Sequence, residues 1–141
     1  MNPHLKYRSN NAFSWTRADM LLLIYERAVT ALQDGVRCLE SRTRREAARP
    51  EDADLNHARN AVQRAIVAIS EGLNPDLGEV PTNIMRLCIF VIDQTRTDSL
   101  TGWQSSFRVI QTLREGFLAV ADDARLMEHS GRIPGLDVTS N

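Results

Sequence analysis

Hydrophobic residues recur along the chain at the three- and four-residue spacing of a buried helix face, in four separate stretches. The first follows Thr16 and reaches Leu39, the second covers 53–73, the third follows Thr82, and the fourth begins after TRTDS at 95–99. Turn-forming residues separate the stretches, above all in GLNPDLGEVP at 72–81. Because short connections favour antiparallel neighbours, the pattern predicts an all-α fold, an antiparallel up-down four-helix bundle.

The same spacing predicts which side chains form the core. The first face is Ala18, Leu21, Leu22, Tyr25, Ala28, Val29, Leu32, Val36 and Leu39, and the second is Leu55, Ala58, Val62, Ala65, Ile66, Ile69 and Leu73. The third is Ile84, Leu87, Cys88 and Val91, and the fourth is Trp103, Phe107, Ile110, Leu113, Phe117, Val120, Ala121 and Ala124. We expect Thr16 with Asp19, Asp52 or Asp54, and Thr82 to cap the first three helices.

The two ends of the chain depart from this pattern. Residues 1–15 are polar but carry large apolar side chains, which predicts an N-terminal docking segment on the domain surface. The bundle is expected over 16–128. Periodicity stops near HSGRIPGLDVTSN, so 129–141 are expected to form a flexible tail.

Two of the stretches hold more apolar residues than one helix face requires. In MLLLIY at 20–25, Met20 and Leu23 point away from the core face and Ile24 lies at its edge. A second surplus lies in the third stretch and comprises Met85, Ile89, Phe90 and Ile92. Either these helices are central and contact two neighbours each, or the surplus forms an exposed groove for an amphipathic partner. The residue pattern alone leaves both interpretations open.

Composition and charge exclude several classes of function. The 17 basic and 18 acidic residues give a net charge of −1, which argues against binding to nucleic acid. The longest apolar runs fall far short of the roughly 20 residues that span a bilayer. Both cysteines lie in apolar stretches, which favours buried thiols over a disulfide. With no secretory leader at the N-terminus, these features predict a cytoplasmic protein.

Candidate chemistry is sparse. Bundles hold metals through Glu-x-x-His pairs on facing helices, and the nearest match, Asp54-x-x-His57, occurs once at a helix start. No motif marks a nucleophile, no glycine-rich loop could hold phosphate, and Arg125 and His129 lie at the end of the last helix. We therefore expect no metal, no cofactor and no enzyme activity.

The order of motifs resembles that of the flagellin export chaperone family (FliS). The resemblance begins with Tyr7 in a polar segment, the cap of Thr16 and Asp19, and Leu22, Leu23 and Tyr25. It continues in RAIVAISEGLNPDLGEVPTNIMRLCIFVI, where Ala65, Ile66, Ile69, Leu73, Asn83, Ile84, Leu87, Cys88 and Phe90 fall on family positions, and in LREGF at 113–117. Glu26-Arg27 replaces the family's Asp-Gly, both tyrosines of the third helix are replaced, and the first connection is longer and more charged.

The resemblance implies a cytosolic bundle that binds the disordered C-terminal segment of flagellin, prevents premature polymerisation and assists delivery to the export apparatus. It also implies that residues 1–15 can cover the hydrophobic surface, so that their deletion would strengthen binding. The predicted partner-binding residues are Tyr7, Met20, Leu23, Ile24, Tyr25, Ile89 and Phe90. The alternative is a helical adaptor or oligomerisation protein without a secretion client, whose apolar surplus would form a homodimer interface.

Overall fold

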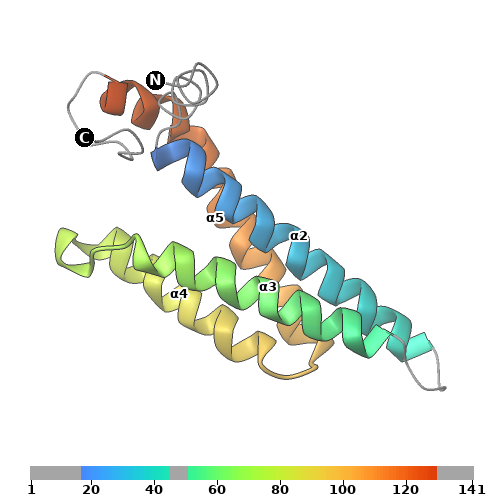
Figure 1. Cartoon of the computed structure of the whole chain (residues 1–141). Coiled ribbons are helices and arrows are strands. Elements are labelled where there is room, and N and C mark those ends of the chain that lie inside the picture. The colour runs from blue at the N-terminus through green and yellow to red at the C-terminus, as the bar shows by residue number, and fades with distance from the viewer. Residues whose placement is uncertain (1–16, 45–50, 130–141) are drawn as a thin grey trace, which may run out of the picture. The chain divides into compact units, whose positions relative to one another are not determined.

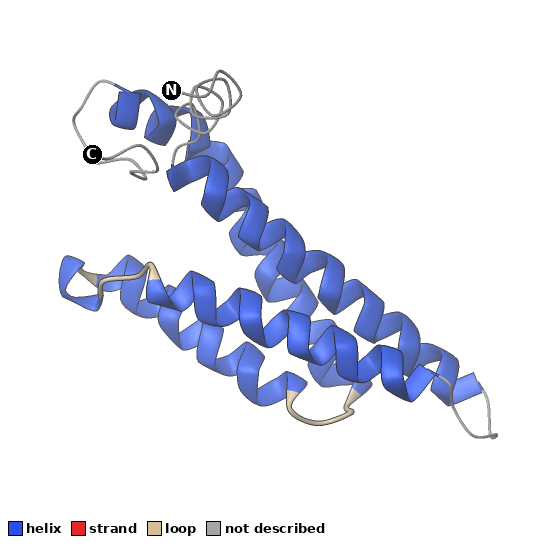
Figure 2. Cartoon of the chain, viewed as in Figure 1, coloured by secondary structure: helices blue, strands red, loops and turns tan. Residues whose placement is uncertain are grey.

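The structure is a computed structural model that describes residues 17–44 and 51–129. Within these ranges, four α-helices and one short 3-10 helix follow one another (Figure 1). They are α2 (Arg17–Arg44), α3 (Glu51–Glu71), η1 (Pro75–Leu77), α4 (Glu79–Thr95) and α5 (Leu100–His129). Within the described ranges there is no strand, as Figure 2 shows. The predicted all-α class is confirmed.

The chain divides into two compact units. One comprises residues 24–114, and the other comprises 1–23 together with 115–141, of which 17–23 and 115–129 are described. Segments of all four helices lie in the first unit, where they are packed antiparallel. This confirms the predicted four-helix bundle, whereas the predicted docking segment 1–15 and almost all of the predicted tail lie outside the described residues.

With the exception of Ala31, the buried apolar side chains of the 24–114 unit are ones that the periodicity indicated. The fully buried side chains include one large aromatic residue, Trp103, and a set of aliphatic residues, each of which stabilises the fold by roughly 1.5–3 kcal/mol. The aliphatic set is Leu32, Leu55, Val62, Ile66, Ile69, Val91 and Ile110. Gly35 of α2 provides the space for the Trp103 ring, since a Cβ at Gly35 would lie 2.1 Å from it.

Local signals set the helix ends, with two differences from the prediction. The first is that α3 begins at Glu51, before Asp52 and Asp54, so neither of these residues caps it. Ser99 caps α5, because its hydroxyl oxygen accepts from the N–H of Gly102 at 3.1 Å. The second difference is that Thr82 does not cap α4, which begins at Glu79. The Thr82 hydroxyl donates instead to the carbonyl oxygen of Gly78 at 2.8 Å. Pro81 fits inside the first turn of the helix, where its missing N–H has no partner to lose.

A polar cluster joins the helices at one end of this unit. Asp98, between α4 and α5, forms ion pairs with Arg42 of α2, at 2.8 Å, and with Arg59 of α3. Arg59 also donates from Nε to the carbonyl oxygen of Thr95 at 2.8 Å, and its guanidinium lies 5.8 Å from the Trp103 ring centroid. The cluster therefore connects four helices through three charged side chains.

Candidate functional site

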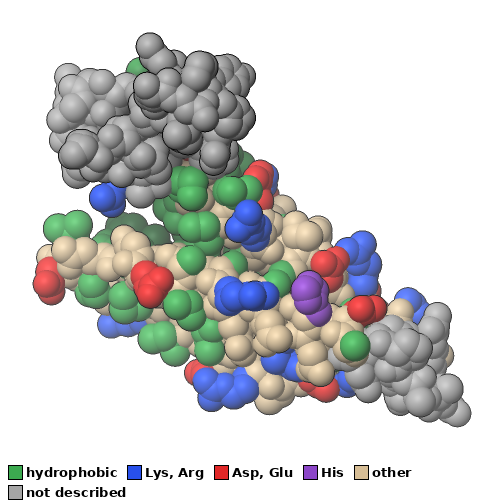
Figure 3. Space-filling view, viewed as in Figure 1, with side chains coloured by type: hydrophobic (Ala, Val, Ile, Leu, Met, Phe, Trp, Pro, Cys, Tyr) green, Lys and Arg blue, Asp and Glu red, His purple; other side chains and the backbone are tan. Residues whose placement is uncertain are grey.

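Five large apolar side chains of α3, η1 and α4 are exposed, and we call them the α4 surface. They are Val67, Leu77, Val80, Ile89 and Phe90. In the view of Figure 3, hydrophobic side chains gather along α4 and around the turn that joins it to α3. Of the four surplus residues of the third stretch, Ile89 and Phe90 belong to this surface, whereas Met85 and Ile92 are half-buried.

Ile89 and Phe90 lie on opposite sides of the exposed face of α4. Their exposed fractions are 57% and 37%. Ile89 directly follows Cys88, which faces α3, whereas Phe90 lies one turn before Gln94, which faces α5. Gln94 lies against α5, because a Cβ built at Gly102 of α5 would lie 2.7 Å from the side-chain oxygen of Gln94. Ile89 therefore lies on the side of α4 that is nearer α3, and Phe90 lies on the side that is nearer α5.

Val67 of α3 extends this surface on the Ile89 side. Ser70 and Cys88 are hydrogen-bonding neighbours across the α3–α4 contact, which sets the register of the two antiparallel helices. Val67 lies one turn before Ser70, and Ile89 directly follows Cys88. Because α3 and α4 are antiparallel, Val67 and Ile89 lie at a similar height along the two helices, on their outer side. Val67 is 48% exposed. The periodicity of α3 alone could not have assigned it to the same surface as Ile89.

Two adjacent residues of α2 have different environments. Tyr25 is only 3% exposed, so its ring belongs to the core, on the face where the periodicity placed it. Burial, with the neighbouring Cys88 as a smaller cause, raises the pKa of Tyr25 to about 12. Burial likewise raises the pKa of the Cys88 thiol. Ile24, in contrast, is half-buried and lines a groove between α2 and α3.

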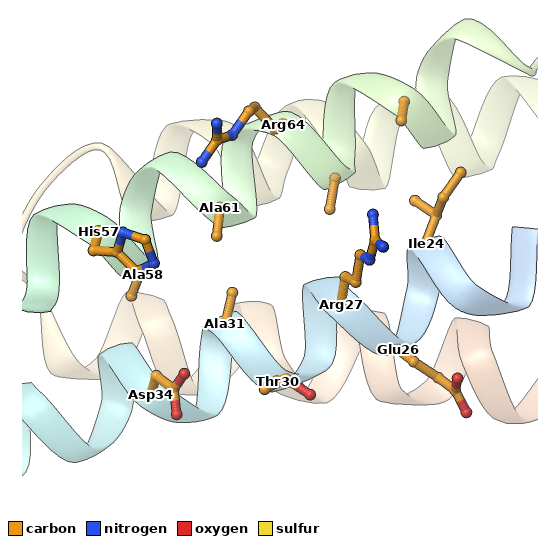
Figure 4. Close-up of a pocket in the computed structure, with 12 residues that line it drawn as sticks. Ile24, Glu26, Arg27, Thr30, Ala31, Asp34, His57, Ala58, Ala61 and Arg64 are labelled. Atoms are coloured by element: carbon orange, nitrogen blue, oxygen red, sulfur yellow. The ribbon is translucent and has the colours of Figure 1, made fainter.

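The groove between α2 and α3 has a volume of about 580 Å³. Its apolar lining consists of Ile24 and Ala31 from α2 and of Ala58, Ala61, Ala65 and Ala68 from α3. Figure 4 shows Ala31, Ala58 and Ala61 pointing into the space between the two helices. The polar lining is Glu26, Arg27, Thr30, Asp34, His57 and Arg64. We call this the alanine groove.

Sequence reasoning did not predict the alanine groove, although its signal is present in the sequence. The alanines of α3 recur at three- and four-residue intervals and therefore lie along one side of the helix. Ala58 and Ala65 were assigned to the core face, and both are buried. The groove exists because the facing residue of α2, Ala31, is also an alanine. The sequence of α3 alone does not show this.

The remaining predicted site residues are not brought to either surface by the described structure. Met20 and Leu23 are half-buried and belong to the other compact unit. Tyr7 lies outside the described residues. Their role in partner binding stays a prediction, as does that of Tyr25.

Other observations on the described residues add no catalytic or metal-binding site. No cluster of three or more His, Cys, Asp or Glu residues suited to a metal ion occurs in 17–44 or 51–129. Both cysteines are free thiols, with Cys88 buried and Cys38 half-buried. None of the helices in the described part of the chain has the length and apolarity needed to cross a membrane. Comparison with protein families, curated proteins and solved structures finds no match to this chain.

Proposed function

We propose that this protein is a cytoplasmic flagellar export chaperone that binds the disordered C-terminal segment of flagellin. The observation that carries the proposal is the exposure of Ile89 and Phe90 on α4. The all-α bundle is the fold that the family resemblance implies, and the resemblance supplies the identity of the client. Holding this segment would prevent premature polymerisation of flagellin and assist its delivery to the export apparatus.

The α4 surface is suited to an amphipathic segment that orders when it binds. The exposed Arg86 and Asp93 lie between Ile89 and Phe90 around the circumference of α4. A bound segment would therefore meet both apolar and charged side chains. A disordered segment loses conformational entropy on binding, and burial of its apolar side chains against this surface offsets that loss. Each square ångström of apolar surface that binding removes from water contributes about 25 cal/mol to the binding free energy. Binding of this kind requires no cofactor and no enzyme activity.

The test is a calorimetric titration of the full chain with a peptide of the flagellin C-terminal segment. Ile89→Asp places a charge in the proposed contact, and because Ile89 is exposed, the bundle should fold normally. We expect the dissociation constant to rise by at least about tenfold, the equivalent of 1.4 kcal/mol. Thr112→Asp, at an exposed position in the interior of α5, is the matched control and should leave the affinity unchanged.

Equal affinity for the wild type and Ile89→Asp would exclude the α4 surface as the client site. Light scattering distinguishes the alternative function. If the chain forms a dimer at low concentration and Ile89→Asp dissociates it, while no flagellin peptide binds, the exposed residues serve self-association. The protein would then be an oligomerisation module or adaptor without a secretion client.

A further inference from the structure

We propose that the alanine groove docks an acidic amphipathic helix of a partner, at a site separate from the α4 surface. Its apolar lining comes from α2 and α3, whereas the α4 surface is centred on the exposed face of α4. The inference does not depend on the identity of the client at the α4 surface. Three features of the groove carry it: its shape, its unpaired charges and its length.

The shape of the groove follows from short side chains on both helices. Alanine adds only a methyl group beyond the backbone, so the facing alanines leave an apolar space between α2 and α3 (Figure 4). Helix-in-groove recognition uses such a space, because leucine-sized side chains of the incoming helix fill it at three- and four-residue intervals. The lining runs from His57 to Ala68, about 16 Å or three helical turns along α3.

The charges of the groove select the chemistry of the partner. Glu26 is already paired with Arg114 at 3.0 Å, and Asp34 is paired with Arg37. Arg27 of α2 and Arg64 of α3 form no ion pair within the described part of the chain, and both are exposed. The acidic groups are thus neutralised and the basic groups are available. A helix with acidic residues beside its apolar stripe complements this arrangement.

A second copy of this chain complements the groove less well. If the α3 helices of two copies packed antiparallel about the middle of the alanine stripe, the symmetry axis would pass near residue 63. The two Arg64 side chains would then approach each other as like charges. An acidic partner instead places opposite charges at Arg64 and at Arg27.

The test uses two synthetic helical peptides of about five turns, 18 residues, which exceeds the length of the groove. Both carry leucine and alanine on one face, flanked by glutamate in the probe and by lysine in its control. Fluorescence anisotropy with the full chain should show binding of the glutamate peptide that weakens with added salt, and no binding of the lysine peptide. The double variant Arg27→Glu, Arg64→Glu should raise the dissociation constant at least about tenfold.

Two further variants separate the groove from general charge effects. Ala61→Leu fills the groove and should also weaken binding of the glutamate peptide, whereas Arg108→Glu, an exposed arginine of α5, should not. Ile89→Asp should leave this affinity unchanged, so failure here and failure at the α4 surface are distinguishable. The proposal is overturned if the glutamate peptide does not bind, if the double variant binds it equally well, or if Ala61→Leu only dissociates a dimer.

Discussion

At the scale of single residues, the contact between Gly35 and Trp103 best illustrates how the bundle is held together. Trp103 is fully buried, and a Cβ at Gly35 would lie 2.1 Å from its ring. Glycine is a poor helix former, and its place in the interior of α2 is explained by this close approach of α5. The sequence shows Gly35 in a helical stretch but does not show which side chain occupies the space.

We expect Gly35→Ala to destabilise the protein by about 1–3 kcal/mol, because the buried Trp103 ring has to move. Without that clash, alanine would stabilise a helix interior by up to about 1 kcal/mol. Gly116→Ala in α5 is the control, since a Cβ there has nothing within 4 Å and should stabilise slightly. Urea denaturation measures both variants. A Gly35→Ala protein as stable as the wild type would contradict the proposed packing.

At the scale of helices, local periodicity predicts burial well and becomes unreliable where a position depends on a neighbouring helix. Every predicted core residue of α3 from Leu55 to Ile69 is buried, because all of them lie on one stripe. Val120 of α5 was predicted to be in the core but is 53% exposed, whereas the next residue, Ala121, is buried. Adjacent residues point about 100° apart, and at this level of α5 the buried stripe includes Ala121 but not Val120.

The ion pairs of Asp98 join residues of different helices, Arg42 of α2 and Arg59 of α3. They predict that the stability of the fold depends on pH. Hydrogen bonding from Arg42, together with the charge of Arg59, lowers the pKa of Asp98. A carboxyl whose pKa is lower in the folded state stabilises the fold at pH values above its unfolded pKa. This stabilisation is lost as the pH falls through the lowered folded value.

Asp98→Asn should therefore lower the free energy of unfolding by about 1 kcal/mol or less at about pH 7, since solvent screens this partly exposed carboxylate. The difference from wild type should shrink at about pH 3, where protonation begins to remove the wild-type interaction. Asp93→Asn is the control, because Asp93 forms one exposed ion pair, with Arg96 at 3.6 Å. A difference that is the same at both pH values would contradict this role of Asp98.

At the scale of the whole molecule, the sequence predicted the fold class and part of the candidate site. Of the apolar surplus of α4, Ile89 and Phe90 are exposed, whereas Met85 and Ile92 are half-buried. The periodicity of α2 placed Tyr25 on the core face and Ile24 at its edge, and the structure agrees, because Tyr25 is buried and Ile24 is half-buried. The periodicity of one helix does not show that Ile24 lines a groove, because the groove depends on the facing alanines of α3.

The central claim is that the chain binds the C-terminal segment of flagellin, and the most direct test compares two forms of that client. The full chain is mixed with monomeric flagellin and with flagellin lacking its C-terminal segment, and complex formation is measured by light scattering coupled to size exclusion. We predict a stable complex with intact flagellin and none with the truncated form. Equal binding of both forms, or binding of neither, would contradict the proposed function.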